Sequence, residues 1–218
     1  MYGSFASNVD MQSGAPALGT PEYAKSALAS GQIARRLNLP FRSSNTTVSN
    51  CIDAQAAFES EMSLWSSVMG HANLVNHAAG WLEGGLTASF EKLVIDAEII
   101  SNTKRLLTGF NQIKDLLEFD YYDKFEFPGN FLKEKITRKL YWEEFYLPSP
   151  VIDRGSLREW KENQSTDSFI RARQAAREII SNYKQANLDR QIIHTMTELV
   201  SSYARQAGAD QLPIINLV

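Results

Sequence analysis

The sequence predicts an α/β protein in which short parallel strands alternate with helices. Three stretches in the first half each begin with a short run of apolar or small residues, pass through a loop of Ser, Asn and Gly, and end in a helical pattern. Their matching positions, Phe5, Phe41 and Val75, are 36 and 34 residues apart. A spacing of roughly 35 residues is that of a strand–helix unit. Successive units of this kind imply parallel strands with right-handed crossovers.

The first unit begins at residues 2–6, and its loop from Asn8 to Gly19 leads into a helix. Thr20 followed by Pro21 is typical of a helix start, because Thr supplies a capping hydroxyl and Pro fits the first helical position. We expect this helix to end near Leu37.

The second unit begins at Phe41, and Asp53 is expected to cap a helix over residues 54–69. The third unit begins at Asn73, and its helix is expected to start near Thr87.

The character of the chain changes near residue 110. We expect a partial strand–helix domain over residues 1–110 and a helical C-terminal extension over residues 111–218. Within the extension, helical patterns cover residues 131–145, 166–184 and 188–206, each with an apolar stripe typical of a packing face.

Polar residues follow the expected strands at their C-terminal ends, namely Asn8, Asp10, Asn45 and His77. The active sites of (β/α)₈ barrels are built there. An open doubly wound sheet and a (β/α)₈ barrel both satisfy the pattern of strand–helix units. Periodicity indicates units and not closure, so it leaves both architectures open.

The composition excludes several classes of protein. The chain of 218 residues is 44% hydrophobic and has a net charge of −3, which is typical of a globular protein and not of a nucleic-acid-binding one. It has no apolar run long enough to span a membrane and no secretory signal, so we expect a cytoplasmic protein. Cys51 is the sole cysteine, and no histidines share metal-ligand spacing, so no metal site is predicted.

Two long glycine-containing stretches carry a family resemblance. Residues 3–23, GSFASNVDMQSGAPALGTPEY, and residues 77–98, HAAGWLEGGLTASFEKLVIDAE, resemble the trimethylamine methyltransferase family of corrinoid-dependent methylamine and glycine-betaine methyltransferases. The likeness covers nearly the whole chain. Family members are about twice as long, so the chain resembles their C-terminal part. It also has Pro-Gly-Asn at residues 128–130, where relatives tend to have Gly-Gly-His.

The resemblance implies the last units, about three, of a (β/α)₈ barrel followed by terminal helices. It also implies transfer of a methyl group from a tertiary or quaternary methylamine to a Co(I) corrinoid, which a separate partner protein carries. No permanently bound cofactor is implied. The trimethylamine branch uses pyrrolysine, and this sequence has standard residues only, which favours quaternary amines such as glycine betaine.

The glycine-rich stretch around Trp81 and Glu83 supplies candidate site residues. A quaternary ammonium cannot donate hydrogen bonds, so aromatic faces and negative potential must hold it. Trp81 and Phe5 are candidate faces, and Glu83 is a candidate catalytic carboxylate. The alternative is that Trp81 packs at the barrel end and Glu83 accepts bonds from glycine amides. Backbone contact with the corrinoid is assigned to Gly80, Gly84 and Gly85.

The loops supply the remaining candidates. His77 is a candidate catalytic residue that orients substrate, or else a core histidine. Asp10 is a candidate partner of the cation, and Arg42 a candidate clamp for a betaine carboxylate, with Asn45 beside them. The alternative for these three residues is turn chemistry.

A second hypothesis is a non-catalytic barrel fragment that acts as an interaction or amine-binding module. Three units leave exposed edge strands, which need a partner. We therefore expect a homo-oligomer or a complementing N-terminal half.

Overall fold

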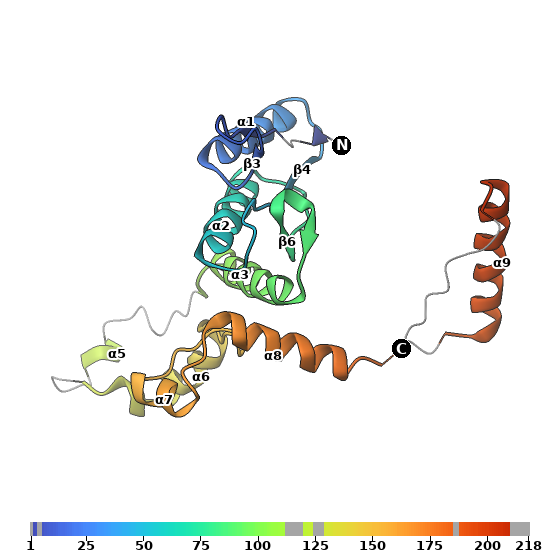
Figure 1. The fold of residues 1–218 in the computed structure, drawn as a ribbon. Helices are drawn as coiled ribbons and strands as arrows, with labels where there is room; N and C mark the ends of the chain where they lie inside the picture. Colours follow the sequence, from blue (N-terminus) through green and yellow to red (C-terminus); the bar gives the residue numbers. More distant parts are fainter. Residues whose placement is uncertain (1, 4–5, 112–119, 124–128, 185–187, 210–218) are drawn as a thin grey trace. The chain divides into compact units, whose positions relative to one another are not determined.

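The computed structural model describes residues 2–3, 6–111, 120–123, 129–184 and 188–209. Contacts along the chain divide it into two compact units, residues 1–180 and residues 181–218 (Figure 1). The expected boundary between residues 110 and 111 stays a prediction.

The first unit is built on a parallel sheet of three short strands. These are β1 (Tyr2–Gly3), β4 (Phe41–Ser44) and β5 (Leu74–Asn76), in the order β1-β4-β5. Gly3 lies opposite Arg42, and Ser44 lies opposite Asn76. The predicted α/β class and the parallel pairing of the three units are therefore confirmed. Over the described residues the sheet is small and open.

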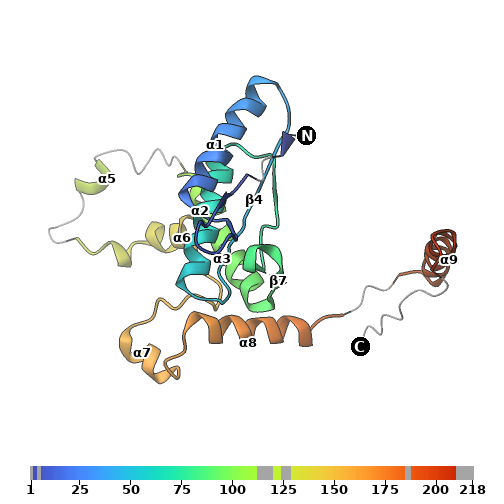
Figure 2. The same ribbon diagram turned by 45° about the horizontal axis from the view of Figure 1, so that its top comes forward.

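Two helices cover one face of this sheet. α1 (Pro21–Arg36) and α2 (Ala54–Met69) pack against each other and against β4 (Figure 1 and Figure 2). The side chains of Thr20 and Asp53 accept hydrogen bonds from the backbone N–H groups of Tyr23 and Ala56, so both predicted N-caps are confirmed.

The two helices approach each other closely at two glycines. A Cβ atom added to Gly31 of α1 would overlap the carbonyl oxygen of Gly70, the residue that ends α2. Arg35 Nη1 donates to the same Gly70 oxygen at 2.7 Å. The absence of a side chain at Gly31 therefore sets the distance between α1 and α2.

The side chains of β4 alternate between the two faces of the sheet. Ser43 lies on the helix-covered face, where its hydroxyl accepts a hydrogen bond from Ser67 Oγ of α2 at 2.9 Å. Since successive strand residues point to opposite faces, Arg42 and Ser44 lie on the face opposite α1 and α2. Leu74, the partner of Arg42 in β5, is 44% exposed there.

Two hairpins interrupt the expected loops. β2 (Asn8–Val9) pairs with β3 (Pro16–Ala17), and β6 (Trp81–Leu82) pairs with β7 (Thr87–Ala88) around a 3-10 turn, η1 (Glu83–Gly85). Glycines with positive φ at the second turn allow the chain to reverse where we expected a direct passage from strand to helix.

The third helix starts later than predicted. α3 spans Phe90–Thr108, and the hydroxyl of Ser89 accepts a hydrogen bond from the backbone N–H of Lys92 as its N-cap. The prediction that this helix begins near Thr87 was wrong, because Thr87 pairs with Leu82 in the hairpin.

The C-terminal half is helical among its described residues. A buried glutamate of α3, Glu98, holds part of it, because its carboxylate accepts from Tyr146 Oη at 2.9 Å and from the Ser149 N–H at 3.0 Å. The elements are α5 (Asp120–Asp123), η2 (Phe131–Lys133), α6 (Lys135–Glu144), α7 (Leu157–Glu162), α8 (Ser168–Ser181) and, in the second unit, α9 (Arg190–Gln206).

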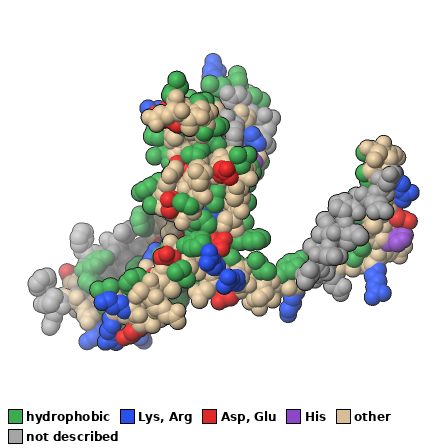
Figure 3. All heavy atoms as spheres, viewed as in Figure 1, with side chains coloured by type: hydrophobic (Ala, Val, Ile, Leu, Met, Phe, Trp, Pro, Cys, Tyr) green, Lys and Arg blue, Asp and Glu red, His purple; other side chains and the backbone are tan. Residues whose placement is uncertain are grey.

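The surface carries charges of both signs. On the face that Figure 3 draws, acidic and basic side chains are interspersed among hydrophobic and polar ones over residues 1–180. Among the described helices, none combines the length and the apolar character needed to cross a membrane.

Gly31→Ala tests the close packing of α1 on α2. The added methyl group would overlap the Gly70 carbonyl oxygen, so the free energy of unfolding should fall by about 1–3 kcal/mol in urea denaturation. The control is Gln32→Ala at the exposed neighbouring position. Equal stability of the two variants would show that α1 and α2 do not approach at Gly31.

Candidate functional site

The carboxyl ends of β4 and β5 meet through hydrogen bonds. The backbone N–H of Asn45 donates to the Asn76 oxygen at 3.2 Å, and Asn45 Nδ2 donates to the Ala78 oxygen at 2.8 Å. Ser44 Oγ lies 3.3 Å from His77 Nδ1. The two segments that follow these strands are therefore tied together.

His77 and Trp81 stack on each other. Their ring centroids are 3.8 Å apart, with an angle of 31° between the ring planes. A Cβ atom at Gly85 would overlap the indole ring of Trp81, so glycine at this position leaves room for the indole. The stack joins the end of β5 to the β6–β7 hairpin.

The tip of the β6–β7 hairpin is held by the loop after β4. Glu83 N–H donates to the Ser49 oxygen and Gly84 N–H to the Thr47 oxygen, both at 2.9 Å. Glu59 of α2 fixes this loop, because its Oε2 accepts from the backbone N–H groups of Val48 at 2.8 Å and Ser49 at 3.1 Å. The hairpin tip is therefore connected to α2 through hydrogen bonds.

The base of the hairpin is held by α3. Gly80 N–H donates to Asp96 Oδ2 at 2.8 Å, and the Gly80 oxygen accepts from Ser89 N–H at 3.0 Å. Asp96 also forms an ion pair with Lys92, and both side chains are 1% exposed. Lys92 Nζ donates to Ser60 Oγ of α2 at 2.7 Å. Burial raises the pKa of the Asp96 carboxyl, although the Lys92 ammonium opposes that change.

The imidazole of His77 favours its neutral form. Burial lowers the pKa of His77 below the ordinary value of 6.5, and the positive charge of Arg42 lowers it further. Arg42 lies on the face of β4 opposite α1 and α2, with its guanidinium beside Gly3 of β1. A cationic and a neutral side chain thus share the end of the sheet at neutral pH.

Four of the predicted site residues come together: Arg42, Asn45, His77 and Trp81. Asn45 is 2% exposed, and its Oδ1 has no hydrogen-bond partner within the described chain. The structure therefore places an aromatic ring, a guanidinium, a buried amide and an imidazole that favours its neutral form at one end of the sheet.

The two predicted carboxylates take part in local turns. Glu83 is exposed at φ +52°, and its Oε2 accepts from Thr87 Oγ1 across the hairpin at 2.6 Å. Asp10 is exposed, and its Oδ2 accepts from the hydroxyl of Ser13 and from the N–H of Ser13 at 2.9 Å. The bond from the Ser13 hydroxyl, and after it the bond from the N–H, lowers the pKa of the Asp10 carboxyl below its usual range. Phe5 lies outside the described residues.

The three predicted glycines differ in their surroundings. Gly80 is buried, and a Cβ atom there would lie 3.2 Å from Leu93 Cβ. Gly85 lies against Trp81, whereas a Cβ atom at Gly84 would meet nothing within 4 Å. Of the three, Gly84 has the open space that a flat ring system needs for contact with the backbone.

Sequence reasoning missed the residues that support the site. Four residues position the site, although each looks ordinary in the sequence: Ser44, Glu59, Lys92 and Asp96. The available signal was Lys92 and Asp96, a pair of opposite charges four residues apart in the predicted helix.

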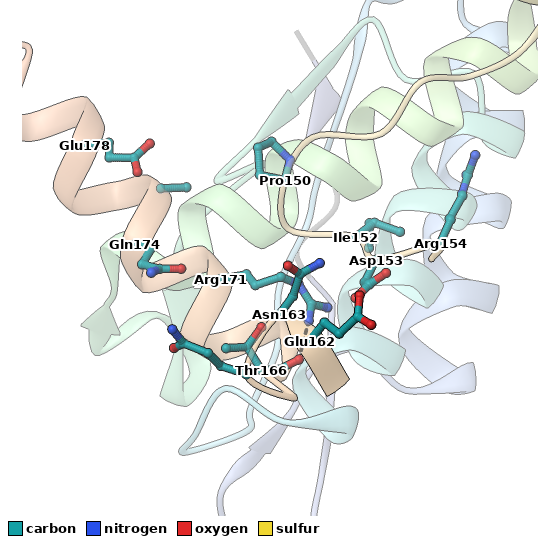
Figure 4. Close-up of a pocket in the computed structure, with 12 residues that line it drawn as sticks. Pro150, Ile152, Asp153, Arg154, Glu162, Asn163, Thr166, Arg171, Gln174 and Glu178 are labelled. Atoms are coloured by element: carbon teal, nitrogen blue, oxygen red, sulfur yellow. Dashed lines mark hydrogen bonds between the residues drawn. The ribbon is translucent and has the colours of Figure 1, made fainter. Parts of the chain in front are cut away.

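A cavity of about 500 Å³ lies elsewhere, between residues 150–166 and α8. In Figure 4 the Arg171 side chain lies among the residues that line it. Arg171 Nε donates to the Val151 oxygen at 2.9 Å, and Arg171 Nη1 donates to the Thr166 oxygen. The Arg171 guanidinium is already hydrogen-bonded to backbone carbonyls, and none of the predicted site residues lines this cavity. We therefore do not place the candidate site in this cavity.

Comparison with known proteins identifies the family. The family model described as trimethylamine methyltransferase (MTTB) matches residues 1–208. The chain belongs to the trimethylamine methyltransferase family. The predicted resemblance to the C-terminal part of this family is therefore confirmed.

Relatives within the family are more than twice as long. Glycine betaine methyltransferase of Desulfitobacterium hafniense (strain Y51) is 34% identical over 212 residues, which cover 96% of this chain and 44% of the relative. Trimethylamine methyltransferase MttB of Methanosarcina thermophila is 30% identical over 197 residues, which cover 89% of this chain and 40% of the relative.

In this member of the trimethylamine methyltransferase family, Arg42→Gln tests the charge at the site. Removal of the guanidinium should raise the pKa of His77, because a neutral neighbour no longer opposes protonation of the imidazole. The pKa should stay below 6.5, since burial is the larger cause. An NMR titration of the His77 ring protons measures it. An unchanged or lower pKa would contradict the proximity of Arg42 and His77.

Proposed function

We propose that this chain forms the C-terminal part of an enzyme that transfers a methyl group from a methylated amine to the Co(I) corrinoid of a partner protein. Membership of the trimethylamine methyltransferase family is the observation that supports it. Relatives bear the names of glycine betaine and trimethylamine methyltransferases. The chain spans 40–44% of their length, so the activity is proposed for the assembled protein.

In this proposal β1, β4 and β5 are the last strands of a (β/α)₈ barrel. The face opposite α1 and α2 then forms the inside of the barrel, which agrees with its polar side chains at Arg42, Ser44 and Asn76. The open sheet presents edges that need pairing. An N-terminal half, as a separate chain or within a longer one, is the partner that would close it.

The site has features suited to a quaternary or tertiary ammonium donor. The indole of Trp81 offers a π-system that attracts such a cation. His77 beside it favours the neutral form, so the imidazole does not repel a positive charge. Arg42 suits the carboxylate of a betaine, since guanidinium groups bind carboxylates in bidentate fashion. These features favour a zwitterionic amine such as glycine betaine.

In this proposal the chain contributes to methyl transfer by positioning the reactants. The C–N bond breaks with its electron pair left on nitrogen, and the Co(I) acceptor supplies the pair for the new bond to the methyl group. The protein must align nitrogen, methyl and acceptor and exclude water. The open backbone at Gly84 is the place we assign to contact with the corrinoid.

Glu83 is proposed to add negative potential near the donor. Its carboxylate is exposed and already accepts from Thr87, so its effect on a bound cation passes through solvent. An exposed pair of opposite charges contributes little, and about a two- to fivefold effect on affinity is expected.

A methyl-transfer assay tests the proposal. The chain, alone and fused behind the N-terminal part of the glycine betaine methyltransferase relative, is mixed with Co(I) cobalamin and either glycine betaine or trimethylamine. The Co(I) absorbance should disappear with a true donor in the fused protein. No change with either amine in either protein would contradict the proposed function.

The same assay measures the role of Glu83. Glu83→Gln should weaken apparent affinity for the amine about two- to fivefold and leave the melting temperature unchanged, because Gln also accepts from Thr87. The control is Glu22→Gln, which removes one exposed carboxylate at the start of α1. A lower melting temperature with unchanged affinity would assign Glu83 a structural role.

A further inference from the structure

The buried Lys92–Asp96 pair takes no part in the proposed chemistry, yet it connects three elements. Both oxygens of the Asp96 carboxylate are used, Oδ1 by Lys92 Nζ and Oδ2 by the Gly80 N–H. Lys92 also donates to Ser60 of α2. The pair therefore joins α2 and α3 to the residue that precedes β6.

Stability alone does not explain two buried charges. An apolar pair of similar volume commonly stabilises a protein as well as a buried ion pair does. Apolar side chains could not accept a hydrogen bond from Gly80, whose N–H would then be buried without a partner. Beyond packing, the Asp96 carboxylate supplies a hydrogen-bond acceptor in a fixed direction for the Gly80 N–H.

The orientation of Gly80 decides where the next residue lies. Gly80 adopts φ +91°, and α3 holds both of its backbone polar groups, the N–H through Asp96 and the oxygen through Ser89. Trp81 follows directly, and its indole lies on the imidazole of His77. A rotation of the Gly80 peptide would separate the two rings.

We propose that Asp96 is a positioning residue, which holds the Gly80 N–H and so keeps the Trp81 indole stacked on the His77 imidazole. Lys92 and Ser60 in turn hold the Asp96 carboxylate. The consequence for methyl transfer rests on the proposed function, but the consequence for the ring geometry does not.

Two double variants of the chain separate positioning from packing. In Lys92→Met, Asp96→Asn the buried charges are gone, but the Asn oxygen still accepts from Gly80. In Lys92→Met, Asp96→Leu the charges are gone and so is the acceptor, at nearly the same side-chain volume. The ring-current shift of the His77 protons, assigned with Trp81→Leu, should survive in the first variant and be lost in the second. Its survival in both variants, or its loss in both, would overturn the proposal.

Hydrogen exchange in the unmodified chain tests the same contact if the leucine variant does not fold. A hydrogen bond to a charged group should slow exchange of the Gly80 amide about 10- to 150-fold relative to the same glycine in an unstructured peptide. Exchange at the rate of the peptide would overturn the proposal.

An amine-binding measurement distinguishes the positioning role of Asp96 from the proposed function in methyl transfer. With glycine betaine as the probe, the fused protein that carries the leucine pair should bind at least about tenfold more weakly than the one with the asparagine pair. Equal affinity in the two would overturn a role of Asp96 at the amine site. If the unmodified fusion binds no amine, the proposed function fails, and the NMR and exchange results still decide the positioning role.

Discussion

A buried carboxylate with two partners, the Lys92 ammonium and the Gly80 N–H, holds the start of the β6–β7 hairpin against α3. Removal of one partner of a buried ion pair costs about 3–5 kcal/mol, because the other charge is left without compensation. The Asp96 carboxylate is therefore held in place by Lys92, and its hydrogen bond to the Gly80 N–H fixes the direction of the backbone at Gly80. The Trp81–His77 stack, and with it the form of the candidate site, depends on that direction.

The same hairpin is held at its other end by an independent set of bonds. Glu59 orders the loop after β4, and that loop accepts the N–H groups of Glu83 and Gly84. One anchor is on α2, which packs on the sheet, and the other is on α3, which packs on α2, whereas Arg42 and His77 belong to the strands and their ends. Packing of these helices thus sets the position of the hairpin that lies beside those polar groups. An arrangement of this kind is preorganised, which is what catalysis by positioning requires.

Much of the fold could be predicted from the sequence, because its signals are local. Thr20 and Asp53 cap helices through their own backbone neighbours, and the spacing of Phe41 and Val75 follows from the length of a strand–helix unit. The β6–β7 hairpin could not be predicted in this way. Its turn depends on hydrogen bonds to Thr47 and Ser49, which are distant in sequence. The role of Asp96 was hidden for the same reason, since a helical Lys–Asp pair does not reveal whether it is buried or what it holds. Among the site residues, those at strand ends were predictable from topology, whereas the carboxylates of Glu83 and Asp10 proved to serve local turns.

The form of the candidate site depends on the stacking of the His77 imidazole on the Trp81 indole. A nuclear Overhauser spectrum of the ligand-free chain with labelled histidine measures this most directly. The ring centroids lie 3.8 Å apart, so cross-peaks are predicted between the His77 ring protons and indole protons that disappear in Trp81→Phe. Absence of these cross-peaks in the folded, unmodified chain would contradict the stacking of the two rings.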